Sequence, residues 1–345
     1  MIVDDSTFMR KILADILRED KDIIVVGEAK NGKEALEKIP LLKPDVITLD
    51  VEMPIMNGIT TLKNIVKKYN IPTVMISSLT MEGANLTLNA LEEGAVDFIS
   101  KPKNIFNLSG EKIKLEIIDK VRIASKSNMY SKYTKPYIPK SSNTLLTKRG
   151  LKEKEFEYIV AIGTSTGGPR ALQSVLPLLP KNINGAIVVV QHMPPKFTKS
   201  LADRLNTLTE IKVKEGKEGE ILKKGCCYIA PGDFHMKVVN KENKYILELS
   251  KEEPIKGLRP AVDILMESVA RLDGLKKIGI IMTGMGSDGS NGIVQIKKSN
   301  GYTIAQDEES SVVFGMPRLA IETGYIDKVV PLNNIAHEIM GIMGV

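Results

Sequence analysis

The feature that most constrains the fold is an alternation of short apolar runs with amphipathic helical patterns. Five such units follow one another before residue 126, and the alternation resumes after residue 150. Strands that alternate with helices in this way build parallel sheets with helices on both faces. The sequence therefore predicts an α/β protein with two doubly wound parallel-sheet domains, at residues 1–125 and 156–345, joined by a linker at 126–155.

The expected strands are apolar runs rich in β-branched residues. They are Ile2–Val3, Ile23–Val26, Val46–Leu49, Val74–Ile76 and Phe98–Ile99 in the first domain, and Tyr158–Ile162, Ala186–Val190, Cys226–Ala230, Ile278–Met282, Tyr302–Ala305 and Lys328–Val330 in the second. The expected helices are Thr7–Arg18, Lys33–Ile39, Ile59–Lys68, Ala84–Glu92, Glu111–Ala124, Arg170–Leu176, Thr198–Leu208, Ala261–Leu272, Asn291–Lys298 and Asn334–Met343. We expect Lys237–Val239 and Tyr245–Leu249 to form an antiparallel hairpin added to the second sheet.

The excess positive charge of the chain is confined to the linker. The net charge of +6 comes from 48 basic and 42 acidic residues. Six of the basic residues and none of the acidic ones lie between Lys126 and Gly150, in a stretch rich in Ser, Asn, Thr, Lys and Pro. This composition is typical of a solvated linker, although Tyr130, Tyr133 and Tyr137 leave nucleic-acid binding or domain docking open. Because the rest of the chain is balanced in charge, we expect no nucleic-acid partner.

Several other classes of protein are disfavoured. No run approaches the roughly 18–20 uncharged apolar residues that a membrane span needs, and two carboxylates stand near the start, where a signal peptide carries positive charge. We therefore expect a cytoplasmic protein that is not inserted in a membrane. The adjacent Cys226 and Cys227 are too few for a zinc site and poorly placed for a disulfide, so we interpret them as strand residues.

Polar residues of the first domain fall at the carboxyl ends of its predicted strands. Asp4 and Asp5 end the first strand, Asp50 the third, Ser77 the fourth and Lys101 the fifth. These strand ends meet at one edge of a parallel sheet. Three clustered carboxylates would repel one another unless a divalent cation such as Mg²⁺ neutralised them. Asp50 would then be able to attack phosphorus, with Ser77 and Lys101 binding the phosphoryl oxygens.

The first domain resembles the receiver domains of bacterial response regulators over its whole length. The resemblance rests on Ile2-Val-Asp-Asp-Ser6, Thr48-Leu-Asp-Val-Glu-Met-Pro-Ile-Met-Asn-Gly58, Met75-Ile-Ser-Ser78 and Phe98-Ile-Ser-Lys-Pro102. It implies a flavodoxin-like fold, with Asp50 as the phosphoacceptor. It also implies that Asp4, Asp5, Asp50 and the carbonyl of Glu52 hold Mg²⁺, that Ser77 and Lys101 read the phosphoryl group, and that Phe98 is the switch aromatic.

The second domain contains candidates for a serine hydrolase triad. Ser165 lies in Gly163-Thr-Ser-Thr-Gly-Gly168, a glycine-permitted turn from a strand into a helix. His192 follows the next strand, and Asp288 follows a third strand in Met282-Thr-Gly-Met-Gly-Ser-Asp-Gly289. In a triad, His192 would deprotonate Ser165 and Asp288 would orient the imidazole. Taken singly, the serine fits a helix cap or a phosphate cradle, and the aspartate fits a turn.

The second domain resembles the catalytic domain of the protein-glutamate methylesterases of bacterial chemotaxis from about Glu157 to the C-terminus. The resemblance rests on the serine, histidine and aspartate segments and on Ala230-Pro-Gly-Asp-Phe-His-Met236. It implies a Rossmann-like hydrolytic domain without a cofactor, with Ser165, His192 and Asp288 catalytic. The oxyanion donors would be backbone amides of Thr166 and Met285. For His235 we expect a structural hydrogen bond, and for His337 an ordinary surface position.

Together the two resemblances imply a phosphorylation-activated enzyme of chemotaxis adaptation. Its substrates would be glutamate methyl esters, and also glutamines, on methylated chemoreceptors, and its phosphodonor would be the chemotaxis histidine kinase. Two alternatives stay open. One is a response regulator whose second domain only binds DNA, and the other is a lipase-like hydrolase of small esters.

Overall fold

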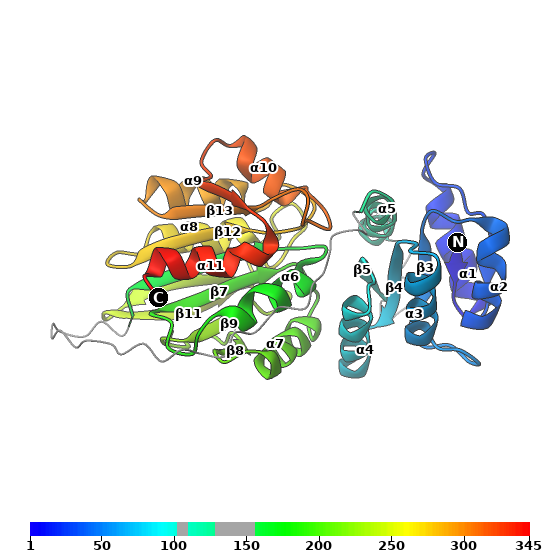
Figure 1. The fold of residues 1–345 in the computed structure, drawn as a ribbon, viewed down its shortest axis with the longest axis horizontal. Helices are drawn as coiled ribbons and strands as arrows, with labels where there is room; N and C mark the ends of the chain where they lie inside the picture. Colours follow the sequence, from blue (N-terminus) through cyan, green and yellow to red (C-terminus); the bar gives the residue numbers. More distant parts are fainter. Residues whose placement is uncertain (102–109, 128–155) are drawn as a thin grey trace. The chain divides into compact units, whose positions relative to one another are not determined.

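The structure, a computed structural model, describes residues 1–101, 110–127 and 156–345. The chain divides into two compact units, unit 1 at Met1–Tyr130 and unit 2 at Ser131–Val345. Each unit contains one large parallel sheet with helices on both faces, as Figure 1 shows. Most of the predicted linker at 126–155, with Tyr130, Tyr133 and Tyr137, lies outside the described residues, as does Pro102.

Unit 1 is a five-stranded sheet in the order β2-β1-β3-β4-β5. This is the flavodoxin-like order, in which ligands bind where the strand order reverses, beside β1 and β3. A side-chain oxygen of Ser6, Asn31, Asn57 or Thr80 accepts a backbone amide at the start of each of the first four helices. The elements are β1 (Ile2–Val3), α1 (Thr7–Arg18), β2 (Glu28–Ala29), α2 (Gly32–Leu42), β3 (Ile47–Asp50), α3 (Gly58–Lys68), β4 (Thr73–Ser78), α4 (Met81–Glu92), β5 (Asp97–Lys101) and α5 (Glu111–Ser125).

The second strand lies later in the chain than predicted. We expected Ile23–Val26, but the residues that pair with Ile2 and Val3 are Glu28 and Ala29. Since β1 is two residues long, it offers no backbone partner in the described structure to Ile23–Val26. Ile24 is accordingly 81% exposed. The apolar pattern of this run was therefore misleading, because a strand also requires a neighbour to pair with.

Unit 2 has a seven-stranded parallel sheet in the order β14-β13-β12-β6-β7-β9-β8. The predicted hairpin exists, but β10 and β11 form a separate two-stranded sheet, which corrects the expectation that they extend the larger one. The strands are β6 (Tyr158–Thr164), β7 (Gly185–Gln191), β8 (Lys212–Glu215), β9 (Cys226–Ile229), β10 (His235–Lys241), β11 (Lys244–Ser250), β12 (Lys276–Ile281), β13 (Tyr302–Gln306) and β14 (Lys328–Val330). The helices are α6 (Gly168–Val175), the 3₁₀ turn η2 (Leu176–Leu178), α7 (Phe197–Leu208), α8 (Val262–Ala270), α9 (Ser290–Lys298), α10 (Met316–Glu322) and α11 (Leu332–Met343).

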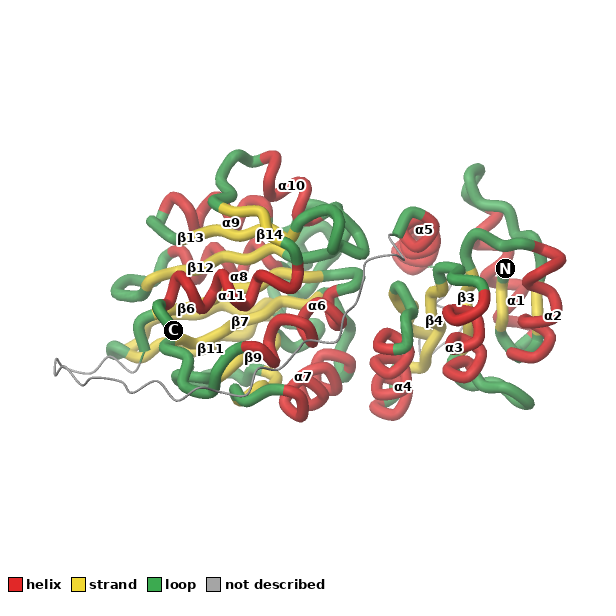
Figure 2. The backbone as a smooth tube through the Cα atoms, viewed as in Figure 1, coloured by secondary structure: helices red, strands yellow, loops and turns green. Residues whose placement is uncertain are grey.

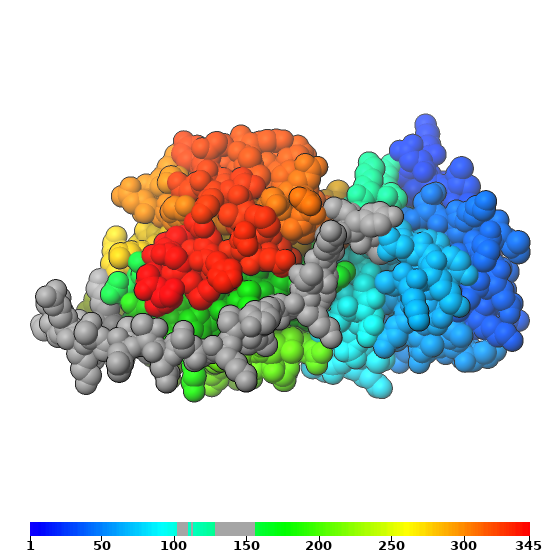
Figure 3. Space-filling model, in the orientation of Figure 1, coloured from blue at the N-terminus to red at the C-terminus, as the bar shows by residue number. Residues whose placement is uncertain are grey.

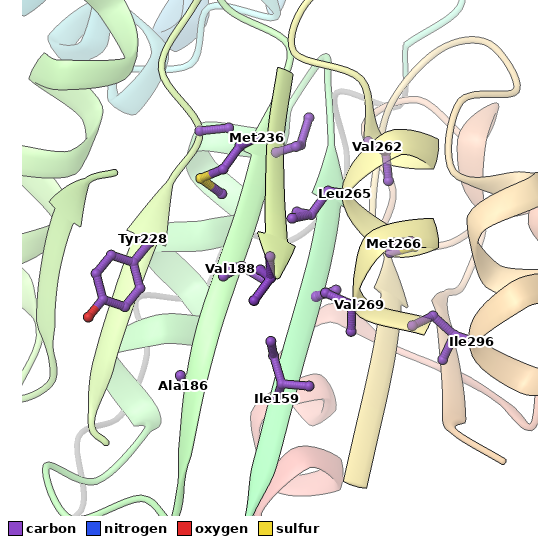
Figure 4. Close-up of a cluster of buried hydrophobic side chains, with 14 of the residues drawn as sticks. Ile159, Ala186, Val188, Tyr228, Met236, Val262, Leu265, Met266, Val269 and Ile296 are labelled. Carbon is purple, nitrogen blue, oxygen red and sulfur yellow. The ribbon is translucent and has the colours of Figure 1, made fainter. Parts of the chain in front are cut away.

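The centre of unit 2 is apolar on both sides of the sheet. All seven residues of β6 and of β7 are buried, as expected for parallel strands covered on both faces. Figure 2 shows the helices on the two faces, and Figure 3 shows the C-terminal residues, in orange and red, on the outside of the unit. In Figure 4, Leu265 and Val269 of α8 lie beside Ile159 and Val188 of the central strands.

The topology of unit 2 marks the carboxyl end of β6 as a candidate ligand site. β6 pairs with β7 along one of its edges, and β12, which comes later in the chain, pairs along its other edge. The strand order therefore reverses at β6, and in open α/β sheets such a reversal is where ligands bind, at the carboxyl ends of the strands.

No helix in the described part of the chain is long and apolar enough to cross a membrane.

Candidate functional site

Three carboxylates gather at the carboxyl edge of the sheet in unit 1. Asp4 follows β1 and Asp50 ends β3, the two strands between which the order reverses. Both are buried, with exposed fractions of 0% and 3%, while Asp5 is exposed. One carboxylate oxygen from each of the three lies within 4.8 Å of the others. The structure therefore brings the three predicted acidic residues together. The residue that caps α1 is Ser6, so Asp5 is free of that role.

Lys101, at the end of β5, faces this cluster. Its Nζ atom lies 2.7 Å from Asp50 Oδ2 and 3.2 Å from Asp4 Oδ2. Burial raises the pKa of Asp50 to about 6 against the opposing charge of Lys101, and the Asp4 carboxylate adds to the shift. Burial also opposes the charge of Lys101, but the two carboxylates outweigh it and raise the Lys101 pKa. The pocket therefore contains excess negative charge that one lysine does not balance.

The acidic cluster fits a hard divalent cation. Its side-chain donors are carboxylate oxygens, the ligands that Mg²⁺ prefers, and the exposed Asp5 leaves a side open to water. Asp4 Oδ2 is buried and pairs with the Lys101 ammonium at 3.2 Å. A carboxylate oxygen has two lone pairs, so this atom can also bind a cation. Asp4, Asp5 and Asp50 are therefore suited to hold Mg²⁺.

The remaining predicted residues of this site lie on β4, on β5 and just after β3. The Glu52 amide donates a hydrogen bond to the Asp50 carboxylate. Ser77, buried near the end of β4, donates its hydroxyl to the Gly83 carbonyl at 3.1 Å. Phe98 is 2% exposed within β5, and Lys120 of α5 lies with its Nζ atom 5.0 Å from the centre of the Phe98 ring. The same ammonium donates to the Phe98 carbonyl.

In unit 2, the three predicted catalytic residues follow three adjacent strands. Ser165 comes directly after β6, His192 directly after β7, and Asp288 in the loop after β12. The strand pairing aligns these ends, because Gly163 of β6 pairs with Val190 of β7 and with Ile281 of β12. The structure thus places all three residues at one edge of the sheet, beside the strand where the order reverses.

His192 and Asp288 form a direct pair. His192 Nε2 lies 2.8 Å from Asp288 Oδ2, and the two side chains are 8% and 2% exposed. Asp288 also accepts the amides of Val262 and Asp263, at 2.6 and 2.9 Å. Burial would raise the Asp288 pKa, but His192 and these amides outweigh it and lower the pKa. Asp288 is therefore an anion that holds the Nε2 proton of His192 and leaves Nδ1 as the basic nitrogen.

Ser165 stands at the start of the turn into α6. Its amide donates to the Thr283 carbonyl at 3.0 Å, so backbone contacts fix it against the β12 loop. Gly284 in that loop also lies close to Ser165, because a Cβ atom added at this glycine would lie 2.8 Å from Ser165 Cβ. In residues 156–345, no hydrogen bond joins the Ser165 hydroxyl to His192. Catalytic hydrogen bonds often tighten only when substrate binds.

Gln191 links Ser165 to His192, a contact that the sequence analysis missed. This buried residue at the end of β7 accepts the Thr164 hydroxyl at 2.5 Å. Its amide nitrogen donates to the carbonyls of Ser165 and His192, at 2.9 and 3.2 Å. Gly168 makes room for it, because a Cβ atom there would lie 2.0 Å from Gln191 Oε1. The signal in the sequence was a polar residue at the end of an otherwise apolar run.

The two predicted oxyanion donors come from the turn after β6 and from the loop after β12. Thr166 follows it and is 6% exposed, with its carbonyl accepting the Thr283 hydroxyl at 2.9 Å. Met285 follows Gly284 and is 43% exposed. Lys256 also contacts this loop, because its ammonium donates a hydrogen bond to the Ser287 hydroxyl at 2.6 Å.

The other candidate side chains lie outside this arrangement. His235 is fully buried, and its Nε2 is 3.2 Å from the Glu253 carbonyl, which confirms the expected structural hydrogen bond. His337 is exposed on α11, as expected. Cys226 and Cys227 are buried strand residues with free thiols, also as expected.

Two family models match the chain. The one described as CheB methylesterase matches residues 160–339, more than half of the sequence. The chain belongs to the CheB methylesterase family. The model described as the response regulator receiver domain matches residues 1–110. The predicted family, the α/β fold class and the carboxylic ester hydrolase class are confirmed by these matches, which favour the methylesterase interpretation over the DNA-binding and lipase-like alternatives.

Relatives of this CheB-family chain match it over almost its full length. Proteins named protein-glutamate methylesterase/protein-glutamine glutaminase are 47% identical in Thermotoga maritima, covering 99% of this chain and 98% of that one, and 46% identical in Bacillus subtilis, covering 98% and 96%. The same name belongs to a Pyrococcus abyssi protein that is 45% identical, covering 99% and 92%. The crystal structure of the Thermotoga maritima CheB methylesterase catalytic domain is 48% identical, has a TM-score of 0.53, and covers 54% of this chain and 98% of that domain.

Proposed function

We propose that this chain is a phosphorylation-activated serine hydrolase that demethylates glutamate methyl esters on chemoreceptors in chemotaxis adaptation and also deamidates glutamines there. The observation that carries the proposal is the His192–Asp288 pair, 2.8 Å apart, on strand ends that adjoin Ser165. The names of relatives that are 45–47% identical over nearly the whole chain supply the substrate class.

In the first half of the proposed reaction, Ser165 Oγ attacks the ester carbonyl carbon while His192 Nδ1 takes the hydroxyl proton. Asp288 stabilises the imidazolium through Nε2. The Thr166 and Met285 amides donate to the oxyanion, and losing one such donor typically costs about 10²–10³-fold in rate. As the ester bond breaks, His192 returns the proton to the leaving oxygen and methanol departs. A glutamine side chain releases ammonia by the same step.

In the second half, water attacks the acyl-serine carbonyl with His192 as the base. Ser165 recovers its proton, and the receptor carries a free glutamate carboxylate. These steps consume one water and release one methanol, so no redox cofactor is required. We accordingly propose that the catalytic domain, residues 156–345, works without a cofactor.

The proposed regulator is unit 1. The chemotaxis histidine kinase would supply the phosphoryl group to Asp50, with Lys101 and Ser77 binding its oxygens and Phe98 responding to the change. Mg²⁺, when bound by Asp4, Asp5, Asp50 and the Glu52 carbonyl, neutralises charge on the carboxylates and the phosphoryl oxygens. The close grouping of the Asp4, Asp5 and Asp50 carboxylates supports this metal site. We propose that the receiver domain spans residues 1–125, the linker 126–155 and the catalytic domain 156–345, and that the protein acts in the cytoplasm without binding nucleic acid.

Mass spectrometry of receptor peptides tests the catalytic part of this proposal. Methylated chemoreceptor membranes are incubated with the wild-type chain, with Ser165→Ala and with Ser174→Ala. Ser174 is a matched control, because it is a buried serine of α6 whose hydroxyl donates only to the Arg170 carbonyl. We expect wild type and Ser174→Ala to convert glutamate methyl esters to glutamates and Ser165→Ala to leave them intact. Equal conversion by Ser165→Ala would contradict the proposal.

A further inference from the structure

Two aspartates of unit 2 cap each other's helices. Asp288, which precedes α9, accepts the first amides of α8, from Val262 at 2.6 Å and Asp263 at 2.9 Å. Asp263, in the first turn of α8, in turn accepts amides at the start of α9, from Gly289 at 2.9 Å and Gly292 at 2.8 Å. Both bonds to Asp263 end on the same oxygen, Oδ1. The arrangement is therefore reciprocal, and one of its two members is the triad aspartate.

Each helix depends on this exchange. α8 begins after Ala261 and α9 after Gly289, and neither residue caps its own helix with a side chain. The first amides of a helix lack partners within the helix, and leaving them buried without acceptors is costly. Asp263 and Asp288 supply the missing acceptors, and their negative charges are also favourable at helix N-termini.

The two helices pack too tightly for the caps to shift freely. A Cβ atom at Gly292 of α9 would lie 2.5 Å from Met266 Cβ of α8. A Cβ atom at Gly289 would lie 2.9 Å from Val262 Cγ1. Figure 4 shows Val262 and Met266 on the helix that carries Asp263, with Ile296 of α9 beside it. The start of α9, and with it Asp288, is therefore held at a fixed place on α8.

Asp263 keeps its carboxyl in this position at an electrostatic cost. It is 5% exposed, and in the described structure no lysine or arginine pairs with it. Burial raises the pKa of Asp263, the charges of Asp288 and Glu267 add to the shift, and the Gly292 and Gly289 amides oppose it. The two amide contacts at the start of α9 hold this buried carboxyl next to the loop that carries Asp288.

We propose that Asp263 is a positioning residue for the catalytic triad. It holds the N-terminus of α9, which fixes Asp288 and, through Asp288, the ring of His192. The inference rests on the proposed function, because it assigns Asp263 to the reaction that Ser165, His192 and Asp288 perform. Asp263 itself contacts neither the substrate nor the reacting atoms.

The test compares two substitutions in the full-length protein. Asp263→Asn keeps an acceptor for both amides of α9, whereas Asp263→Ala removes it. For Asp263→Ala we expect kcat for methanol release to fall on the order of 10²-fold with little change in KM, because a misplacement of about 1 Å costs roughly this much. Asp263→Asn should restore most of the lost rate. Asp327→Ala is the control, since Asp327 accepts the Thr303 amide at 2.9 Å and pairs with Lys297 near the other end of α9; it should leave kcat unchanged.

A second readout separates this inference from the proposed function. The rate at which a sulfonyl fluoride labels Ser165 reports activation of the serine without any receptor. If the wild-type chain is labelled at Ser165 but releases no methanol, the proposed substrate is wrong, and the labelling rates of the two Asp263 variants still decide the role of Asp263.

Two results would overturn the role of Asp263. One is a folded Asp263→Ala variant with wild-type kcat and labelling rate. The other is an equal loss in Asp263→Asn and Asp263→Ala, because the retained acceptor would then be irrelevant. If Asp263→Ala fails to fold by circular dichroism, Asp263→Ser takes its place, since serine is small and polar but too short to replace both carboxylate contacts.

Discussion

At the residue scale, Gln191 connects the end of β6 with the end of β7. Its side chain is the buried group that contacts the Thr164 hydroxyl and the carbonyls of both Ser165 and His192. The Ser165 carbonyl also accepts the Gly168 amide at 2.8 Å, so it keeps one partner if Gln191 is lost. In the described structure, the Thr164 hydroxyl has no second hydrogen-bond partner that would remain if Gln191 were lost.

Gln191→Leu, which keeps the volume and removes the polar atoms, should lower both stability and rate. We expect a loss of about 1–3 kcal/mol in the free energy of unfolding from the unsatisfied Thr164 hydroxyl. The kcat for methanol release should fall on the order of 10²-fold because the two strand ends lose their link. Urea denaturation and steady-state kinetics measure the two effects. In the control Thr303→Val, which removes the buried hydroxyl bond to the Tyr325 carbonyl, only stability should fall. A wild-type kcat in Gln191→Leu would contradict this role.

Position 284 requires a glycine because its backbone approaches the Ser165 side chain closely. A Cβ atom at this position would lie 2.8 Å from Ser165 Cβ and 2.4 Å from Met316 Sδ. Gly284→Ala should therefore displace the turn that carries Ser165 and reduce its labelling by a sulfonyl fluoride on the order of 10²-fold. Gly341→Ala, in α11, is the matched control, because nothing lies within 4 Å of the added atom. It should leave labelling unchanged and stabilise the helix by about 0.5–1 kcal/mol. Equal labelling of the two variants would show that Gly284 is not constrained.

At this scale the sequence was informative about side chains that end strands and silent about contacts between strands. Ser165, His192 and Asp288 could be proposed as a triad because each follows an apolar run with a glycine or proline nearby. The roles of Gln191 and Asp263 could not be, because their partners come from other strands and helices. Such contacts depend on strand register and helix packing, which no local pattern encodes.

At the element scale, the strands whose apolar pattern agrees with their neighbours were predicted well. β6 and β7 are continuous apolar runs with partners on both sides, and both lie where the sequence indicated. The run Ile23–Val26 has the same composition but lacks a paired neighbour. β8 was missed for the opposite reason, because Lys212–Glu215 contains one apolar residue between charged ones and pairs along β9 all the same. Strand pairing, and not apolar content, therefore determines that Ile23–Val26 is not a strand and that Lys212–Glu215 is one.

The acidic edge of the unit 1 sheet should make this unit sensitive to pH in the absence of metal. The pKa of Asp50 is about 6 in the folded state, above its ordinary value of 3.8. The folded state thus binds this proton more tightly than the unfolded state, so the free energy of unfolding falls as pH rises through about 4 to 6. We expect calorimetry of the full chain in EDTA to show this loss between about pH 4 and pH 6, with Asp50→Asn largely abolishing it.

Magnesium should reverse that loss, because a ligand that binds only the folded state stabilises it. Added at about pH 7, it should raise the unfolding temperature of the wild-type unit 1 and have a smaller effect on Asp50→Asn. Asp15→Asn is the control, since Asp15 is 61% exposed on α1. The same pH and magnesium response in wild type and Asp50→Asn would rule out Asp50 as the source.

At the scale of the whole molecule, the chain joins a receiver domain to a methylesterase domain. Phosphorylation of Asp50 would add roughly 1.5–2 negative charges at the edge of the first sheet. Because this added charge is local to Asp50, it can control Ser165 only if it shifts an equilibrium between two conformations of the protein. We therefore expect activation to require Asp50 and the phosphodonor together, with Asp50→Asn unresponsive.

The most direct test of the account is methanol release from methylated receptor membranes, measured for wild type and Ser165→Ala, each with and without a small phosphodonor and Mg²⁺. We predict release by wild type that rises when phosphodonor and Mg²⁺ are present, and none by Ser165→Ala under either condition. Equal release by the two proteins, or no release by wild type under either condition, would contradict the account.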